Sequence, residues 1–137
     1  TCLERRKRRK TRNFVVTCRR SPQSSQLERR VANLPLTVEA GPHVYTVRQQ
    51  KRVGDGTADL DGEISFVNMT ISLLRQNCAS KKREVLLHEV MHGICRNADL
   101  DREWGQEKLE NYVFRITPLL LDVLRRNPQL IAFLVEP

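Results

Sequence analysis

The stretch Leu87-His88-Glu89-Val90-Met91-His92 is the most informative part of this sequence. It lies within the segment 81–96, whose apolar residues recur at helical spacing, with Leu87, Met91 and Ile94 on one stripe. Ser80 precedes this segment and is a typical N-cap residue. The pattern predicts a helix over 81–96. Apolar residues flank both histidines, so most of this helix is expected to be buried, with a polar notch at the motif.

The spacing of the two histidines has a direct chemical meaning. Residues four apart lie one turn apart on one helix face, so His88 and His92 can offer imidazole nitrogens to the same metal ion. Glu89 is rotated by about 100° from His88, which suits a general base that is not itself a ligand. A buried polar notch needs partners, and a metal ion supplies them. The H-E-x-x-H pattern therefore predicts a Zn²⁺ site with Glu89 as the catalytic residue.

A catalytic zinc site needs a third protein ligand and keeps one open position. The next predicted helix, 102–126, offers three carboxylates: Glu103, Glu107 and Glu110. Glu103 lies in the first turn, where a carboxylate is expected in any case because of the helix dipole. Glu107 and Glu110 are one turn apart and either can face the first helix. Glu110 lies deeper in the helix, on the stripe of Val113 and Thr117, and is the preferred third ligand; Glu107 stays open.

The remaining segments predict a small sheet and two more helices. Alternation over 43–48 predicts a strand, and 63–66 with 69–73 predicts a hairpin that turns at 67–68. The turn-rich segment 54–62 resembles a calcium loop but has no carboxylate at the first and twelfth positions, so calcium is not expected. Pro118 predicts a kink within 102–126. Asn127 and Pro128 predict the start of a short helix that ends at 134, and the apolar run 130–135 is expected to close the core.

These features together resemble a known group of enzymes. H-E-x-x-H followed by a glutamate on the next helix is the gluzincin pattern of zinc metallopeptidases. The layout is more similar to small phage- and prophage-encoded proteins related to the ImmA/IrrE-type metallopeptidases. It reads here as Gly62-Glu63-Ile64, then Thr70-Ile71, then Leu87 through Ile94, then Glu110 with Phe114 four residues on. The resemblance covers 43–134 and implies Zn²⁺ held by His88, His92 and Glu110, with Glu89 catalytic.

Charge is distributed unevenly along the chain. The 137 residues carry a net charge of +8, but residues 1–30 contain eleven Lys or Arg and only two Glu, which leaves the rest with −1. Residues 1–35 show no sustained periodicity and predict a basic, disordered tail. The alternative is a nucleic-acid contact through residues 1–30, although no aromatic residues are interleaved to stack on bases. The family pattern described above contains no segment that corresponds to this tail.

The cysteines and the apolar runs bear on location. No apolar run approaches the ~20 residues that a membrane span needs, and no secretory signal follows the basic start. The four cysteines, at positions 2, 18, 78 and 95, are widely spaced. This spacing predicts reduced thiols in a cytoplasmic protein, of a bacterial or phage-infected cell, with no membrane partner. Cys95 is expected to behave as a small buried hydrophobe.

The sequence thus predicts an α+β, minimal zincin-like domain over 36–137: a small antiparallel sheet or hairpin packed on the H-E-x-x-H helix and a second long helix. The expected function is zinc-dependent hydrolysis of a protein or peptide substrate. The alternative is a non-catalytic phage or prophage protein that zinc stabilises, associated with nucleic acid through its tail. The donor for the carbonyl oxygen is left open. Four residues are available: Tyr112, Arg75, Tyr45 and His43.

Overall fold

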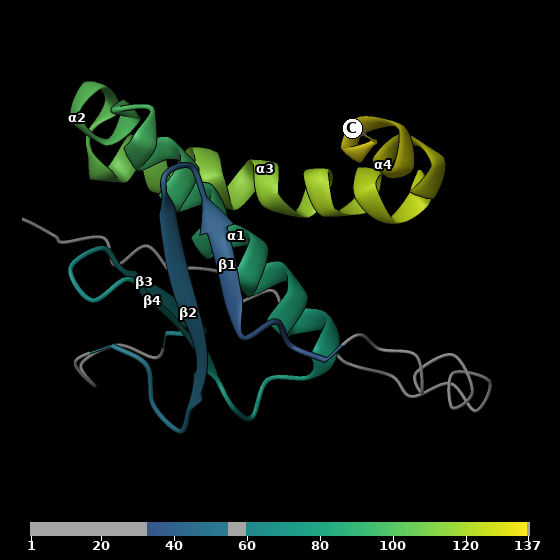
Figure 1. Cartoon of the computed structure of the whole chain (residues 1–137). Helices are drawn as coiled ribbons and strands as arrows, with labels where there is room; N and C mark the ends of the chain where they lie inside the picture. Colours follow the sequence, from purple (N-terminus) through teal and green to yellow (C-terminus); the bar gives the residue numbers. More distant parts are fainter. Residues whose placement is uncertain (1–32, 55–59, 137) are drawn as a thin grey trace, which may run out of the picture. The chain divides into compact units, whose positions relative to one another are not determined.

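The computed structural model describes residues 33–54 and 60–136, which belong to one compact unit spanning 32–137 (Figure 1). Nearly all of the predicted basic tail, 1–35, therefore lies outside the described residues, as does most of the turn-rich segment 54–62. In chain order the elements are β1 (Thr37–Ala40), β2 (His43–Gln50), β3 (Gly62–Ser65), β4 (Thr70–Leu74), α1 (Ala79–Asn97), α2 (Leu100–Trp104), α3 (Gln106–Arg126) and α4 (Pro128–Val135). The predicted α+β class is confirmed.

The sheet is mixed, and the expectation of an antiparallel sheet is wrong at one pairing. The strand order is β1-β2-β4-β3, so β4 lies between β2 and β3. β1 pairs with β2 and β3 pairs with β4 in antiparallel fashion, as the predicted hairpin requires, whereas β2 and β4 run parallel with Val47 opposite Ile71. Alternation of apolar residues shows which face of a strand is buried but not the direction of its neighbour, so the sequence could not reveal this pairing.

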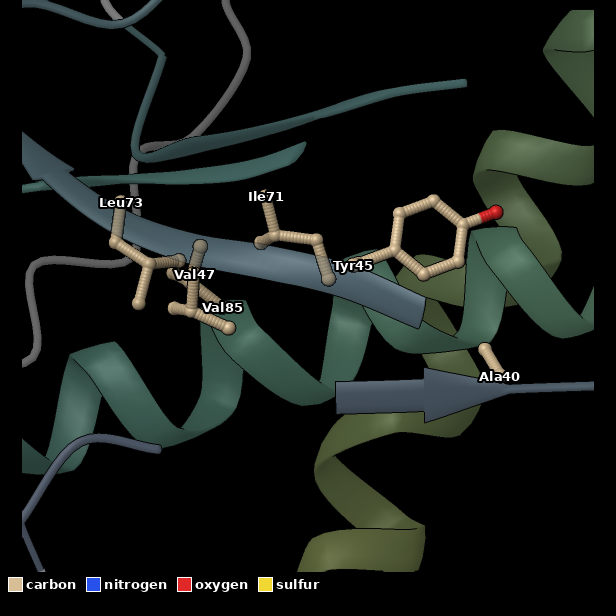
Figure 2. Packing of buried hydrophobic residues seen from close by; sticks show 6 residues of the cluster. All are labelled: Ala40, Tyr45, Val47, Ile71, Leu73 and Val85. Atoms are coloured by element: carbon tan, nitrogen blue, oxygen red, sulfur yellow. The ribbon is translucent and has the colours of Figure 1, made fainter. Parts of the chain in front are cut away.

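The main core lies between the sheet and α1. Its buried residues come from β1, β2, β4 and α1, as Figure 2 shows: Ala40, Tyr45, Val47, Ile71, Leu73 and Val85. Ile71 and Leu73 are fully buried. Gly93 lies on the side of α1 that faces the sheet, where a Cβ would be in ordinary contact with Ala40 Cβ at 3.4 Å. This packing fixes the helix that carries the H-E-x-x-H motif.

The helix boundaries differ from the prediction at two points. α1 begins at Ala79 after Cys78, so Ser80 lies inside the helix and is not its N-cap. The predicted helix over 102–126 is divided by Gly105, whose φ of 73° ends α2 before α3 begins at Gln106. α3 then continues as one helix through Pro118. Its buried residues are Leu109, Val113 and Thr117, and Leu109 and Val113 form a second, smaller cluster with Cys95 of α1.

α4 does not close the core, contrary to expectation. The helix forms where Asn127 and Pro128 predict it, but none of its residues is buried. Among the described elements it contacts α3 alone, which leaves Phe133, Leu134 and Val135 well exposed. An apolar run shows that a segment favours burial, but a chain this small can leave such a run at its surface.

The predictions for the two described cysteines have different outcomes: one is confirmed and one is wrong. Cys95 is free and buried, as expected, whereas Cys78 is disulfide-bonded, so the expectation of reduced thiols fails at that position. Disulfides are typical of oxidising compartments, and the predicted cytoplasmic location therefore gains no support from Cys78. Within 33–54 and 60–136, no helix combines the length and apolar character that crossing a membrane requires.

Candidate metal site and its cleft

Three side chains from two helices converge on one point. The Nε2 atoms of His88 and His92 lie 3.1 Å apart on α1. Glu110 of α3 reaches both rings, with Oε1 3.3 Å from His88 Nε2 and Oε2 3.1 Å from His92 Nε2. One ligand atom from each of the three residues lies within 4.8 Å of the others. Two imidazole nitrogens and one carboxylate are a donor set that suits zinc, so these residues fit the ion.

The structure shows which of the two candidate carboxylates, Glu107 or Glu110, faces the histidines. Leu109 and Val113 are buried against α1, and this contact sets the rotation of α3 about its axis. Glu110, between them, is thereby turned towards the histidines. Glu107 does not join the group and does not line the cleft; it lines an adjoining hollow with Trp104, Gln106 and Lys108. Glu103 lies exposed on α2, away from the group.

Glu89 occupies a different environment from Glu110. Only 6% of its surface is exposed, and its carboxylate accepts a hydrogen bond from the backbone N–H of Ile64 in β3. Burial raises the pKa of Glu89, while the nearby rings of His88 and His92 act in the opposite direction. Glu89 is therefore a buried carboxylate beside the two histidines, and it is not one of the three converging residues.

Glu110 and His92 shift each other's protonation. Hydrogen bonds from His88 and His92 lower the pKa of Glu110 far below its usual range, although partial burial opposes them. For His92, burial lowers the pKa, but the hydrogen bond to Glu110 and its negative charge outweigh burial, so the pKa is raised. Glu110 is thus ionised at any neutral pH, whereas Glu89 binds a proton more readily than an exposed glutamate does.

The group lies in a cleft of about 560 Å³ between β3, α1 and α3. Gly62 lines the cleft where β3 comes closest to α1, since a Cβ there would collide with Val85 Cγ1 and lie 3.1 Å from Glu89 Oε1. The ion pair between Lys81 Nζ and Asp61, at 3.4 Å, also belongs to the lining. The α3 wall is lined by Gln106, Glu110, Phe114, Thr117 and Pro118.

β3 presents free backbone groups along the cleft. It is the edge strand of the sheet, and Leu74 N–H donates to Asp61 C=O at 2.8 Å. Hydrogen-bonded pairs alternate in an antiparallel ladder, so the backbone groups of Gly62 and Ile64 point away from β4. Ile64 N–H is used by Glu89, which leaves the Gly62 N–H and C=O and the Ile64 C=O unpaired with the sheet. The pattern of strands in the sequence does not predict which strand lies at this edge.

The four residues considered as donors to a carbonyl oxygen are not among those that line the cleft. Tyr45 is buried in the main core with 1% exposed, and the ring of His43 lies edge-on to it. Tyr112 stacks against Trp104 at 5.1 Å between ring centroids, and Arg75 donates to Gln49 C=O at 3.5 Å. Gln106 does line the cleft and was missed, although its position four residues before Glu110 was a usable signal.

Comparison of the chain with family models, with curated proteins and with solved structures finds no match in any of the three.

Proposed function

We propose that this protein is a zinc-dependent hydrolase of peptide bonds, with a minimal zincin-like architecture and a relation to the ImmA/IrrE-type metallopeptidases. The observation that carries the proposal is the meeting of His88, His92 and Glu110 beside the buried carboxylate of Glu89. The relation to that family is supported by the sequence pattern alone. A phage or prophage origin belongs to the same part of the proposal.

The ligand count favours a catalytic over a purely structural metal. Among the described residues, the group contains three potential ligands and no fourth His, Cys, Asp or Glu. Structural zinc sites are closed by four protein ligands, whereas catalytic sites have three and keep a position for water or substrate. The cleft beside the group gives a substrate access to that position. The non-catalytic alternative would need a closed site.

Each residue has a defined task in the proposed reaction. His88, His92 and Glu110 would hold Zn²⁺, which supplies Lewis-acid polarisation and lowers the pKa of a water molecule when it is bound. Glu89 removes a proton from the attacking water, whose oxygen bonds to the carbonyl carbon of the substrate. The C–N bond then breaks, and Glu89 passes the same proton to the leaving nitrogen. A raised pKa suits Glu89 to both transfers near neutral pH.

The edge of β3 supports a peptide as the substrate. An extended peptide can add to an exposed sheet edge through main-chain hydrogen bonds, whatever its side chains. The outward C=O and N–H of Gly62 and the outward C=O of Ile64 offer such bonds along the cleft. The same edge holds Glu89 through Ile64 N–H, so a peptide bound there lies beside the general base.

The decisive test is to compare the wild-type protein with Glu89→Gln, using Glu103→Gln on the exposed α2 as control. Zinc content is measured after purification without chelators, and turnover is followed with a library of quenched fluorescent peptides. We expect about one zinc per chain in all three proteins. Turnover should be lost in Glu89→Gln, by about a thousandfold or more, because the base is removed. Equal turnover in Glu89→Gln, or no zinc in the wild type, would refute the proposal.

The basic tail adds a separate prediction that the described residues do not test. Binding to DNA that falls steeply with salt, and that disappears when residues 1–30 are deleted, would support the nucleic-acid role. The two roles are compatible, because the tail and the metal site occupy different parts of the chain.

A further inference from the structure

The proposed hydrolysis leaves one requirement unmet, namely a protein donor for the carbonyl oxygen of the substrate. That oxygen gains negative charge as water attacks, and a positioned N–H or O–H group lowers the barrier. Outside the His88, His92 and Glu110 group, three side chains that line the cleft carry such a donor: Lys81, Thr117 and Gln106. The three differ in whether their donor already has a partner.

Two of these donors are engaged elsewhere. The Thr117 hydroxyl donates to Val113 C=O at 2.8 Å, and Thr117 is almost fully buried. The Lys81 ammonium pairs with Asp61 at 3.4 Å, and Asn77 holds the same carboxylate at 2.9 Å. Lys81 also lies seven residues before His88, which is about 10 Å along the axis of α1. Neither group is placed to receive a charge that develops at the metal site.

Gln106 differs in both respects. Its side chain is exposed and forms no hydrogen bond or ion pair with another described residue. Gln106 lines the cleft at its border with the hollow that Glu107 and Lys108 share. It lies four residues before Glu110, so it occupies the same face of α3 about 6 Å away along the axis. The burial of Leu109 and Val113 that turns Glu110 towards the histidines therefore also directs Gln106 towards the cleft.

The backbone at Gln106 is well supported. Gly105, with φ of 73°, makes the sharp turn that starts α3 at Gln106. The ring of Trp104, just before this turn, stacks edge-on against Tyr112, and Lys108 Nζ lies 5.0 Å over the same ring. A donor on a supported helix start loses less conformational freedom when it meets a substrate than a donor on a loop does.

We propose that Gln106 is a catalytic residue whose side-chain amide donates a hydrogen bond to the carbonyl oxygen of the scissile peptide bond. This inference rests on the proposed function. As the water oxygen bonds to the carbonyl carbon, the electron pair of the C=O bond moves onto the carbonyl oxygen, and the Gln106 N–H stabilises that charge. When the C–N bond breaks, the pair returns to form C=O, and the hydrogen bond weakens. Gln106 transfers no proton.

The test compares Gln106→Glu with Glu107→Gln in the zinc-loaded full chain. Gln106→Glu keeps the size of the side chain but removes its N–H donor. Glu107→Gln makes the reverse change at the neighbouring residue, which does not line the cleft. Two quantities are measured: kcat and KM on the fluorescent peptides, and the affinity for an N-phosphoryl dipeptide by calorimetry. The phosphoryl group imitates the tetrahedral, negatively charged centre and binds without turnover.

We expect Gln106→Glu to lower kcat by about 100-fold, as the loss of one such donor does elsewhere. KM should change by less than about threefold, zinc content should stay at the wild-type level, and Glu107→Gln should match the wild type. The N-phosphoryl dipeptide should bind about 100-fold more weakly to Gln106→Glu. Because the new carboxylate itself repels an anion, Gln106→Ala is measured in parallel and should also lose at least tenfold in both quantities.

Wild-type kcat and wild-type dipeptide affinity in Gln106→Ala would overturn the role of Gln106 and leave the proposed function intact. A rise in KM with kcat unchanged would overturn it too, since it indicates a bond made equally in the ground state. If the zinc-loaded wild type cleaves no peptide, the proposed function fails by itself. The dipeptide affinities of the variants would still show whether Gln106 serves the tetrahedral centre.

Discussion

The two walls of the cleft are built in different ways. The wall formed by α1 and β3 carries His88, Glu89 and His92 and rests on the main core of the sheet. The α3 wall carries Glu110 and Gln106 and is attached to α1 chiefly by a small cluster around Leu109 and Val113. The first wall is therefore fixed by many buried contacts and the second by few. A metal ion bound by both histidines and Glu110 would join the two walls, so metal binding and helix packing should stabilise each other.

The two walls should differ most in how much stability is lost when a buried side chain beneath each is shortened to alanine. Ile71→Ala, under α1 and β3, should lower the free energy of unfolding by about 4 kcal/mol, because the site is fully buried and surrounded by strands. Leu109→Ala should cost about 2 kcal/mol, near the low end for such changes, and should weaken zinc binding as α3 loosens. Chemical denaturation with and without zinc measures both effects. A Leu109→Ala variant with wild-type zinc affinity would contradict the weaker attachment of α3.

The next effect concerns Glu110, the residue by which α3 would bind the proposed zinc ion. Glu110→Ala should reduce zinc affinity by about 100-fold or more, because a charged ligand is lost while both histidines remain. Glu107→Ala is the matched control, since it lies on the same helix three residues earlier and does not face the histidines. Competition with a fluorescent zinc chelator gives both affinities. Equal losses in the two variants would show that α3 is rotated differently from the arrangement described.

The walls should also respond differently to acid. His92 must be neutral to bind zinc, and its raised pKa means that protonation begins above the usual histidine range of about 6.5. Zinc affinity should therefore fall as the pH drops through that raised pKa, with no matching contribution from Glu110, whose pKa is lowered. Zinc titrations between about pH 5 and pH 8 test this. In Glu110→Gln, the fall should move to lower pH, because the charge that raises the His92 pKa is gone.

The smallest expected effect would strengthen the α1 wall. A Cβ at Gly93 would make ordinary contacts, at 3.4 Å from Ala40 Cβ and 3.5 Å from Ile64 Cδ1. Gly93→Ala should therefore stabilise the protein by about 0.5–1 kcal/mol, because alanine loses less backbone entropy in a helix interior. Thermal unfolding measures the change, with zinc affinity as a second readout that should stay the same. A destabilised variant would show that α1 and the sheet lie closer than described.

The two walls of the cleft also differ in how well their residues could be predicted from the sequence. The H-E-x-x-H motif lies within one helix, so local spacing alone placed His88 and His92 on one face of α1, with Glu89 beside them. The hairpin of β3 and β4 was also a local feature, and it formed where the pattern predicted it. Short-range patterns thus sufficed for the wall that the main core supports.

The α3 wall depends on contacts between distant parts of the chain. Glu107 and Glu110 are about one turn apart, and only the packing of Leu109 and Val113 on α1 shows which of them faces the histidines. Gly105 divides the predicted helix because it adopts a positive φ, which no periodicity reveals. The parallel pairing of β2 with β4 and the exposure of α4 were missed for the same reason. These features depend on contacts between segments that are distant in the sequence, and local sequence patterns do not identify such contacts.

Gly62 makes the close approach of β3 to α1 beside Glu89 depend on the absence of a side chain. A single methyl group at this position would meet both Val85 and the Glu89 carboxylate. A Gly62→Ala variant should therefore disturb the surroundings of Glu89 while altering none of the three converging residues. Under the proposed function, position 62 is thus a place where one substitution is expected to separate hydrolysis from metal binding.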